Sequence, residues 1–200
     1  MQAGAEGIFK CRGENKMKTL WIKKSISYDG SQLRPLFAYL EHGIMGDSVV
    51  AFRGPCKVDF KNMIDGEDLL AKSEIQGSNM LHFIFEIFDR NLITGVFLQR
   101  LFASIVIDVL HDNTESKKFL REGDDIYYGK KKLSISIASN SSRSTMIHFA
   151  VNISNKGTPV PTCSLSDFSI EAKDFANECL RKIQKEYVSI CEATVKVRPL

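Results

Sequence analysis

The stretch GDDIYYGKKKLS at residues 123–134 points more directly to a fold and a site than any other part of the chain. Two acidic residues precede a short strand pattern, a turn containing Gly129 follows, and Lys132 opens the next strand pattern. A lysine at the mouth of a sheet can hold a carboxylate or phosphate, while an acid such as Asp125 orients it. The alternative is an exposed hairpin turn with solvated lysines. The stretch therefore predicts an anion-binding site or a solvated turn.

The residues that follow this stretch alternate as they do in a β-hairpin. Apolar and polar side chains alternate over residues 133–138 and 146–153, on the two sides of the polar loop 139–145. His148 and Asn152 fall on the polar face of the second strand, which we expect to share a concavity with Ser134 and Ser136. They are candidate pocket residues, and a solvent-facing sheet is the alternative.

The residues that precede the stretch predict a buried strand and a long helix. Residues 80–88 (MLHFIFEIF) are almost wholly apolar, as in a central strand that is buried on both faces. Beyond Asn91, apolar residues at helical spacing predict a helix that ends near His111. The apolar positions of this helix are Leu98, Leu101, Phe102, Ile105 and Val109.

The remaining patterns complete an α+β domain. They are a strand at 19–24, a helix at 31–42 capped by Gly43, a strand at 48–52, a short helix at 66–72, a helix from Phe168 to Tyr187 with Ser166 or Asp167 as N-cap, and a closing strand at 191–198. Hairpins mixed with separate long helices favour a largely antiparallel sheet with helices packed on it.

The composition is that of an ordinary globular domain. The 200 residues are 44% hydrophobic and 26% charged, which excludes disordered and fibrous classes. A net charge of +3 does not indicate a nucleic-acid partner. The five cysteines show no zinc or disulfide spacing, no signal peptide is visible, and the apolar stretches are too short to cross a bilayer. We therefore expect a cytoplasmic protein with reduced thiols, without a membrane partner.

The first sixteen residues look unlike the rest of the chain. They are short, mixed and unpatterned, and the first strand pattern opens just after Met17. We expect residues 1–16 to be a disordered arm or a non-native leader, and residues 17–200 to form a single domain.

The central stretch resembles the signature of the biotin/lipoate protein ligase superfamily, which is related to class II aminoacyl-tRNA synthetases. Asp125 and Lys132 match its aspartate and lysine at the separation of seven found in biotin ligases, and residues 148–153 resemble its next strand. The resemblance implies a ligase-like fold in which the lysine contacts an acyl carboxylate and an adenylate phosphate. It makes ATP the candidate cofactor. The whole chain, with YDGSQL at 28–33 and FRGPC at 52–56, looks more like an uncharacterised prokaryotic family placed beside these ligases by fold.

Three departures from that signature argue against an ordinary biotin or lipoate ligase. Asp124 stands where the family usually has asparagine, and Ile135 replaces a glycine. The Gly/Arg-rich nucleotide loop is missing before the strand at 80–88, where residues 73–79 contain one glycine and no arginine. Adenylate formation needs donors on a developing phosphate charge, so this loss removes much of the expected stabilisation.

Other candidate groups come from two further strands. Arg53 ends a strand and can bind an anion, while Cys56 is either a buried thiol or a nucleophile with a lowered pKa. His82 lies in the apolar strand with Glu86 on the same face, which makes it a core histidine or a pocket group. The four histidines show no metal-binding spacing, so we expect no metal site.

Two functions follow. The favoured one is binding of a small carboxylate or nucleotide-like ligand, and the sequence leaves acyl transfer undecided. Its site residues are Lys132, Asp125, Arg53, His82, His148 and Asn152. The alternative is a non-catalytic module that uses its sheet edge to form a homodimer.

Overall fold

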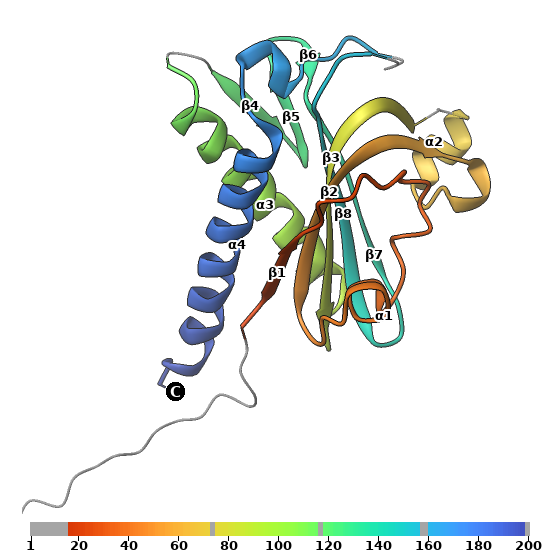
Figure 1. The fold of residues 1–200 in the computed structure, drawn as a ribbon. Helices are drawn as coiled ribbons and strands as arrows, with labels where there is room; N and C mark the ends of the chain where they lie inside the picture. The colour runs from red at the N-terminus through yellow and green to blue at the C-terminus, as the bar shows by residue number, and fades with distance from the viewer. Residues whose placement is uncertain (1–15, 73–74, 116–117, 157–159, 199–200) are drawn as a thin grey trace, which may run out of the picture.

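The computed structural model describes residues 16–198 except 73–74, 116–117 and 157–159. In chain order the elements are β1 (Lys18–Trp21), α1 (Phe37–His42), β2 (Ser48–Val58), η1 (Phe60–Asn62), α2 (Gly66–Ala71), β3 (Ile75–Phe88), α3 (Leu92–Asp112), β4 (Phe119–Glu122), β5 (Asp125–Tyr128), β6 (Lys131–Lys132), β7 (Ser134–Asn140), β8 (Ser144–Asn152), η2 (Leu165–Phe168) and α4 (Ala172–Val195). Figure 1 shows their arrangement. The fold is α+β, as the sequence predicts.

Two sheets organise the domain. The main sheet has the order β1-β2-β3-β8-β7, in which only β1 and β2 are parallel, and a small sheet has the order β4-β5-β6. The predicted hairpin is confirmed, because β7 pairs with β8 from Ser134↔Val151 to Asn140↔Thr145. The main sheet is therefore largely antiparallel.

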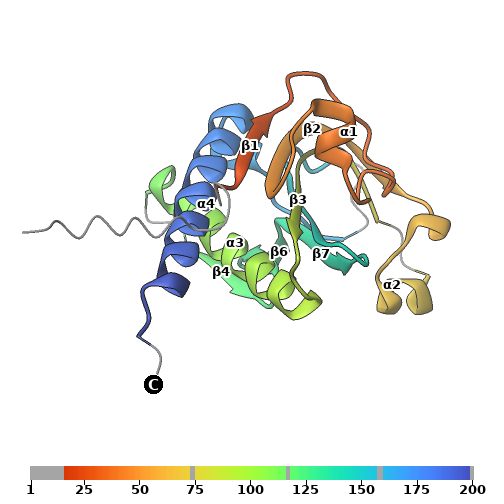
Figure 2. The ribbon, with the colours of Figure 1, turned by 90° about the horizontal axis from the view of Figure 1, so that it is seen from below.

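One face of the main sheet carries the larger core. Side chains from β2, β3 and β8 that alternate along the strands pack against α3 and α4, which lie together on this side in Figures 1 and 2. Phe102 of α3 is fully buried at the centre of this core, in edge contact with Phe83 and Phe149. Period-two strands and period-3.6 helices thus present matching apolar surfaces.

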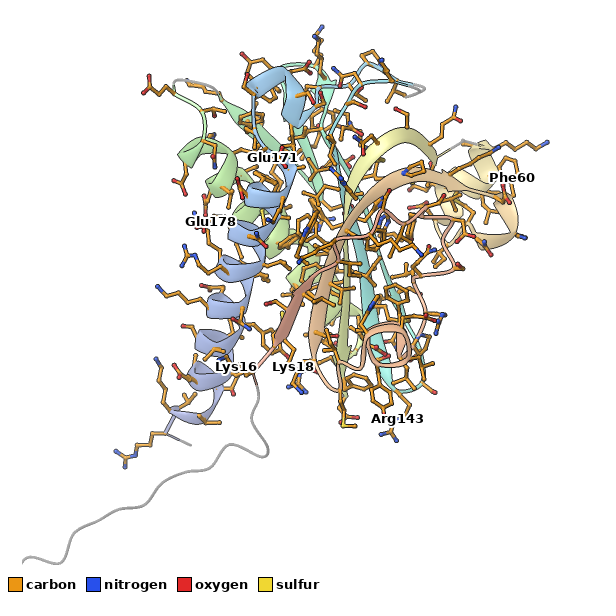
Figure 3. All side chains as sticks on the ribbon, in the orientation of Figure 1. Lys16, Lys18, Phe60, Arg143, Glu171 and Glu178 are labelled. Atoms are coloured by element: carbon orange, nitrogen blue, oxygen red, sulfur yellow. The ribbon has the colours of Figure 1, made fainter. Side chains whose placement is uncertain are left out.

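The other face is covered by irregular chain. Residues 22–35 and α1 cross it in Figure 2, and α1 begins after Leu36, later than the predicted helix. The Gly43 cap is confirmed by its left-handed φ of 69°. The long strands β2 and β3 extend beyond this cover to α2, and Phe60 lies at the outer end of that extension in Figure 3.

The α3 helix is long and apolar enough to cross a membrane, which corrects the expectation that every apolar stretch is too short. It has 21 residues and a window of mean hydropathy 1.8, but 44% of that window is buried inside the protein. It is the one such helix in the described part of the chain. Its apolar side chains, with Phe102 among them, pack on the main sheet as those of a core helix do.

Three local predictions are wrong. The closing strand at 191–198 is absent, because α4 continues to Val195 and positions 187, 191 and 195 extend its inner face at a spacing of four. Glu171, whose side chain accepts from the Lys173 N–H, caps α4 in place of Ser166 or Asp167. The strand predicted at 133–138 does not follow the Gly129 turn directly, because the short β6 pairs with β5 across that turn and β7, which starts at Ser134, joins the main sheet.

The proposed leader falls almost wholly on residues 1–15, which lie outside the described residues. Met17 is fully buried in the larger core, and its carbonyl accepts a hydrogen bond of 2.7 Å from the Gln184 side chain. The chain is therefore integrated into the domain from Met17 onwards.

Candidate functional site

A cavity of about 310 Å³ opens where the main sheet, the small sheet and α2 meet. Its size lies at the lower end of the range of ligand pockets, roughly 300–1,000 Å³. Polar lining comes from Lys132 and Asp125 on the small sheet, His148 on β8 and Asp68 on α2. Aliphatic side chains such as Val58 and Ile75 form the remaining wall. The cavity thus combines a few polar groups with an apolar surface.

The small sheet brings Lys132 and Asp125 together. Tyr127 and Lys132 are register partners, and Asp125 lies two residues before Tyr127 on the same face, so the pair is diagonal. Gly129, at φ 61°, allows the tight turn between the two strands. The Lys132 Nζ lies 2.8 Å from the Asp125 carboxylate. Burial nevertheless raises the pKa of Asp125 above its usual value, and Lys132 opposes this shift.

The backbone of Lys132 is held from two sides. Its N–H donates to the Pro161 carbonyl at 3.1 Å, and its carbonyl accepts from the Cys163 N–H at 3.1 Å. The buried side chain of Asn152 donates to the carbonyls of Lys132 and Cys163 at 3.4 and 3.2 Å. Asn152 therefore positions Lys132 from behind and does not line the cavity.

His82 and His148 form a buried hydrogen-bonded pair. The His82 Nδ1 lies 3.0 Å from the His148 Nε2, and the His82 Nε2 lies 3.3 Å from the Gly54 carbonyl. Tyr28 stacks on His148 with ring centroids 3.7 Å apart. Burial lowers the pKa of His82 to about 4 and lowers that of His148 as well. Both rings are therefore neutral at pH 7.

A close backbone approach puts Tyr28 over the histidines. The Ile26 N–H donates to Arg53, and Tyr28 exchanges hydrogen bonds with Pro55 and Lys57 of β2. A Cβ on Gly54 would lie 1.9 Å from the Ile26 carbonyl oxygen, so only glycine permits this approach. Sequence patterns do not identify Tyr28 as part of the site, although it opens the YDGSQL segment.

The structure separates the predicted site residues. Lys132, Asp125 and His148 line the cavity, while His82 and Asn152 lie behind His148 and Lys132. Arg53 is exposed and pairs in register with Leu81 of the larger core, on the sheet face opposite His82. The arginine is therefore not brought to the cavity.

Two further expectations are decided by the structure. Ser136 lines the cavity together with His148, as expected, although its register partner is Phe149 of the helix-covered face. Ser134 pairs with Val151 of the same face and does not line the cavity. Burial raises the pKa of Cys56 to about 12, which is the opposite of what a nucleophilic thiol requires. Cys56 is thus a buried thiol.

The cavity wall contains more carboxylates than the sequence patterns indicate. Asp65, Glu67 and Asp68 come from α2 and its N-cap, and Asp124 precedes β5. Asp124, which stands at the family's asparagine position, accepts from Gln99 at 2.9 Å and from Ser136 at 2.7 Å. No group of three or more metal-ligating side chains occurs among the residues that the structure describes.

Comparison with known proteins shows the family to which the chain belongs. The family model described as Domain of unknown function (DUF366) matches residues 17–198. The chain belongs to this family. An uncharacterised protein of Methanocaldococcus jannaschii is 32% identical to the DUF366 chain over 177 residues, which cover 86% of this chain and 78% of that protein. A solved protein of unknown function from Pyrococcus horikoshi is 36% identical with a TM-score of 0.88, covering 92% of this chain and 100% of that chain.

The more distant structural neighbours have the ligase fold that the sequence resemblance implies. Biotin protein ligase from Aquifex aeolicus, solved with biotin and ATP, is 15% identical with a TM-score of 0.58, covering 88% of this chain and 72% of that chain. At this identity the likeness shows the fold alone. The DUF366 chain therefore has the fold of biotin and lipoate protein ligases.

The segment that stands in place of the nucleotide loop is largely strand in the DUF366 chain. Residues 75–77 pair with β2 at Val58, Lys57 and Cys56, and residues 75–79 all belong to β3. Ser73 and Glu74 lie outside the described residues. Three positions of this segment thus pair in a sheet ladder. The Ser78 N–H donates to the Lys156 carbonyl, and the Asn79 carbonyl accepts from Ile153 and Ser154, so these backbone groups also have partners within the protein.

Proposed function

We propose that this DUF366 protein binds a small molecule in the cavity, with a carboxylate or phosphate of the ligand at Lys132. The observation that carries the proposal is the position of Lys132, which lines the cavity and has one carboxylate partner among the described residues for its three N–H donors. The Asp125 carboxylate, 2.8 Å from the Nζ, restricts the side chain, and the backbone of Lys132 is hydrogen-bonded on both sides. A cation held in this way recognises an anion with little loss of side-chain entropy.

A thermal-shift screen tests the proposal. The probes are ATP, biotin, lipoate, octanoate and the amino acids, each measured with the wild type, Lys132→Ala and Lys130→Ala. Lys130 is an exposed lysine in the same turn and serves as the matched control. A ligand at one hundred times its Kd stabilises the native state by about 2.7 kcal/mol.

We expect a probe that shifts the melting temperature of the wild type and of Lys130→Ala but not that of Lys132→Ala. The unliganded Lys132→Ala protein should melt within a few degrees of the wild type, because a partly exposed ion pair contributes at most about 1 kcal/mol. Wild-type affinity in Lys132→Ala would show that the lysine is not the binding group.

Acyl activation with ATP is the narrower form of the proposal. The ligase fold and the Asp125–Lys132 pair support it, whereas the strand in place of the nucleotide loop weighs against it. Exchange of labelled pyrophosphate into ATP, in the presence of whichever carboxylate stabilises the protein, would detect the adenylate-forming step. Exchange that disappears in Lys132→Ala is the supporting result.

The alternative function is a homodimer joined through a sheet edge. β1 and β7 are the edges of the main sheet. A monomer by light scattering at micromolar concentration, together with a Lys132-dependent ligand, would favour the binding function over this alternative.

A further inference from the structure

The cavity wall has a charge opposite to that of the ligand group proposed at Lys132. Its lining contains five carboxylates and one lysine, a formal excess of four negative charges. A ligand with anionic groups alone, such as a fatty acid or a free triphosphate, would meet repulsion from most of this wall. The negative charge of the lining therefore favours a ligand that also has a second, cationic group.

Most of these carboxylates already have partners. Asp65 accepts from the N–H groups of Glu67 and Asp68, Asp124 accepts from two side chains, and Asp125 pairs with Lys132. These three acids serve the protein's own hydrogen bonding. They leave the carboxylates of α2 as the groups to consider.

Asp68 is the partly buried carboxylate without a partner in the described structure. Its backbone N–H is capped by Asp65, but its side chain makes no hydrogen bond or ion pair with the described residues. Burial and the neighbouring Asp65 raise the pKa of Asp68 above its usual value. A cationic group bound here would relieve the charge repulsion.

His148 supplies a second acceptor. The Gly54 carbonyl can only accept, so the hydrogen-bond network assigns the proton of His82 to Nε2 and leaves its Nδ1 as an acceptor. His148 must then donate from Nε2 to His82, and its Nδ1 carries a lone pair. This Nδ1 has no partner among the described residues, while the His148 ring lines the cavity and is only 3% exposed. Asp68 and the His148 Nδ1 are thus two hydrogen-bond acceptors of the cavity without a partner in the described structure, beside the exposed Glu67 carboxylate and the Tyr28 hydroxyl.

We propose that the ligand is an amine-bearing carboxylate of the amino-acid class. Its carboxylate lies at Lys132, its amine donates to the Asp68 carboxylate and the His148 Nδ1, and its aliphatic part lies against Val58 and Ile75. This inference rests on the proposed function, which supplies the anion position. It adds the amine, which that function does not require.

Two comparisons test the inference. The first ranks amine-bearing probes (the amino acids) against amine-free ones (acetate through octanoate, biotin, lipoate and ATP) by thermal shift with wild type and Lys132→Ala. We expect the largest Lys132-dependent shift from an amino acid. A largest Lys132-dependent shift from an amine-free carboxylate or from ATP overturns the inference and leaves the proposed function standing. No Lys132-dependent shift from any probe overturns both.

The second comparison removes the proposed amine acceptor. Asp68→Asn keeps the size of the side chain, and Asp59→Asn makes the same change at an exposed carboxylate that does not line the cavity. Asp68→Asn should weaken the best amino acid at least tenfold by calorimetry, while its deaminated analogue changes less than twofold. Asp59→Asn should change both less than twofold. Equal affinity of the amino acid for wild type and Asp68→Asn would contradict the assignment of the amine.

Discussion

The two faces of the main sheet are built from the same three long strands but differ in what they bury. The helix-covered face presents Val49, Phe83, Phe149 and further apolar residues without a buried charge among them, and regular helices cover it. The opposite face mixes Val50, Phe52 and Ile84 with the buried polar residues His82, Glu86 and His148. Alternate residues of the same strands form the two faces. The two faces differ in the chain segments that cover them, which are regular helices on one side and irregular chain on the other.

An irregular cover needs polar partners that a helix supplies internally. The Leu36 N–H, at the start of α1, donates to both oxygens of Glu86 at 2.9 Å, and Ser144 donates to the same carboxylate at 2.7 Å. The Gly54 carbonyl of β2, beside the register shift between Gly54 and Cys56, lies 3.3 Å from the His82 Nε2. Buried backbone groups that no ladder pairs need other partners, and buried side chains supply them here. The cavity opens at the end of this polar face, where α2 and the small sheet replace the cover.

The largest expected effect is on the helix-covered face. Phe102→Ala removes a fully buried ring that contacts Phe83, Phe85 and Phe149, and should destabilise the protein by about 3–5 kcal/mol in urea unfolding. Phe97→Ala, at a position of α3 that is 67% exposed, is the matched control and should cost less than about 1 kcal/mol. Similar losses in both variants would mean that the two positions do not differ in packing.

The next largest effect is a pH dependence of stability that comes from the polar face of the sheet. The pKa of His82 is about 4 in the folded protein against 6.5 unfolded, so the unfolded state binds more protons between these values. Stability is therefore full above pH 6.5 and declines as the pH falls towards 4, by roughly 3 kcal/mol for this residue. The lowered pKa of His148 acts in the same direction.

NMR titration of the imidazole resonances separates these histidines from the titrating carboxylates. The His82 ring should stay neutral down to about pH 5, and the midpoint of His148 should lie well below 6.5. A midpoint near 6.5 for either ring would contradict the buried pair.

A smaller effect is expected from Gly54→Ala. The added Cβ collides with the Ile26 carbonyl, so residues 22–28 must shift and the Tyr28–His148 stack loosens. We expect a loss of about 1–3 kcal/mol and a changed near-ultraviolet circular dichroism spectrum. Gly66→Ala is the control, since nothing lies within 4 Å of a Cβ there. An unperturbed Gly54→Ala spectrum would show that the cover does not depend on this approach.

The smallest effect is expected from Arg53→Ala. The arginine is exposed and lies on the sheet face opposite His82, so its removal should change stability by less than about 0.5 kcal/mol. Any ligand found in the thermal-shift screen should bind to this variant as it binds to the wild type. Weaker binding would show that Arg53 contributes to the ligand site, as the sequence pattern predicts.

The sequence-based predictions succeeded where the interacting residues lie close together in the chain. The β7–β8 hairpin, β3 and α3 were predictable because each depends on periodicity within one or two segments. The Asp125–Lys132 contact spans seven residues and one turn, and the local pattern together with the resemblance to the ligase signature indicated it. The strand proposed at 191–198 failed because Cys191 and Val195 fit both a period of two and a spacing of four. Packing of α4 on the sheet decides between them.

The sequence by itself determined the α+β class, the order of the main elements and the lysine–aspartate pair, since these depend on local periodicity and short separations. Only the tertiary structure decided which groups share the cavity, because Tyr28, Asp68 and His148 come from segments far apart in the chain. A strand's alternation shows which residues share a face, but not what covers that face. Here Gly54, which permits close backbone contact, and α2, which carries carboxylates, shape one face of the sheet into the wall of a cavity.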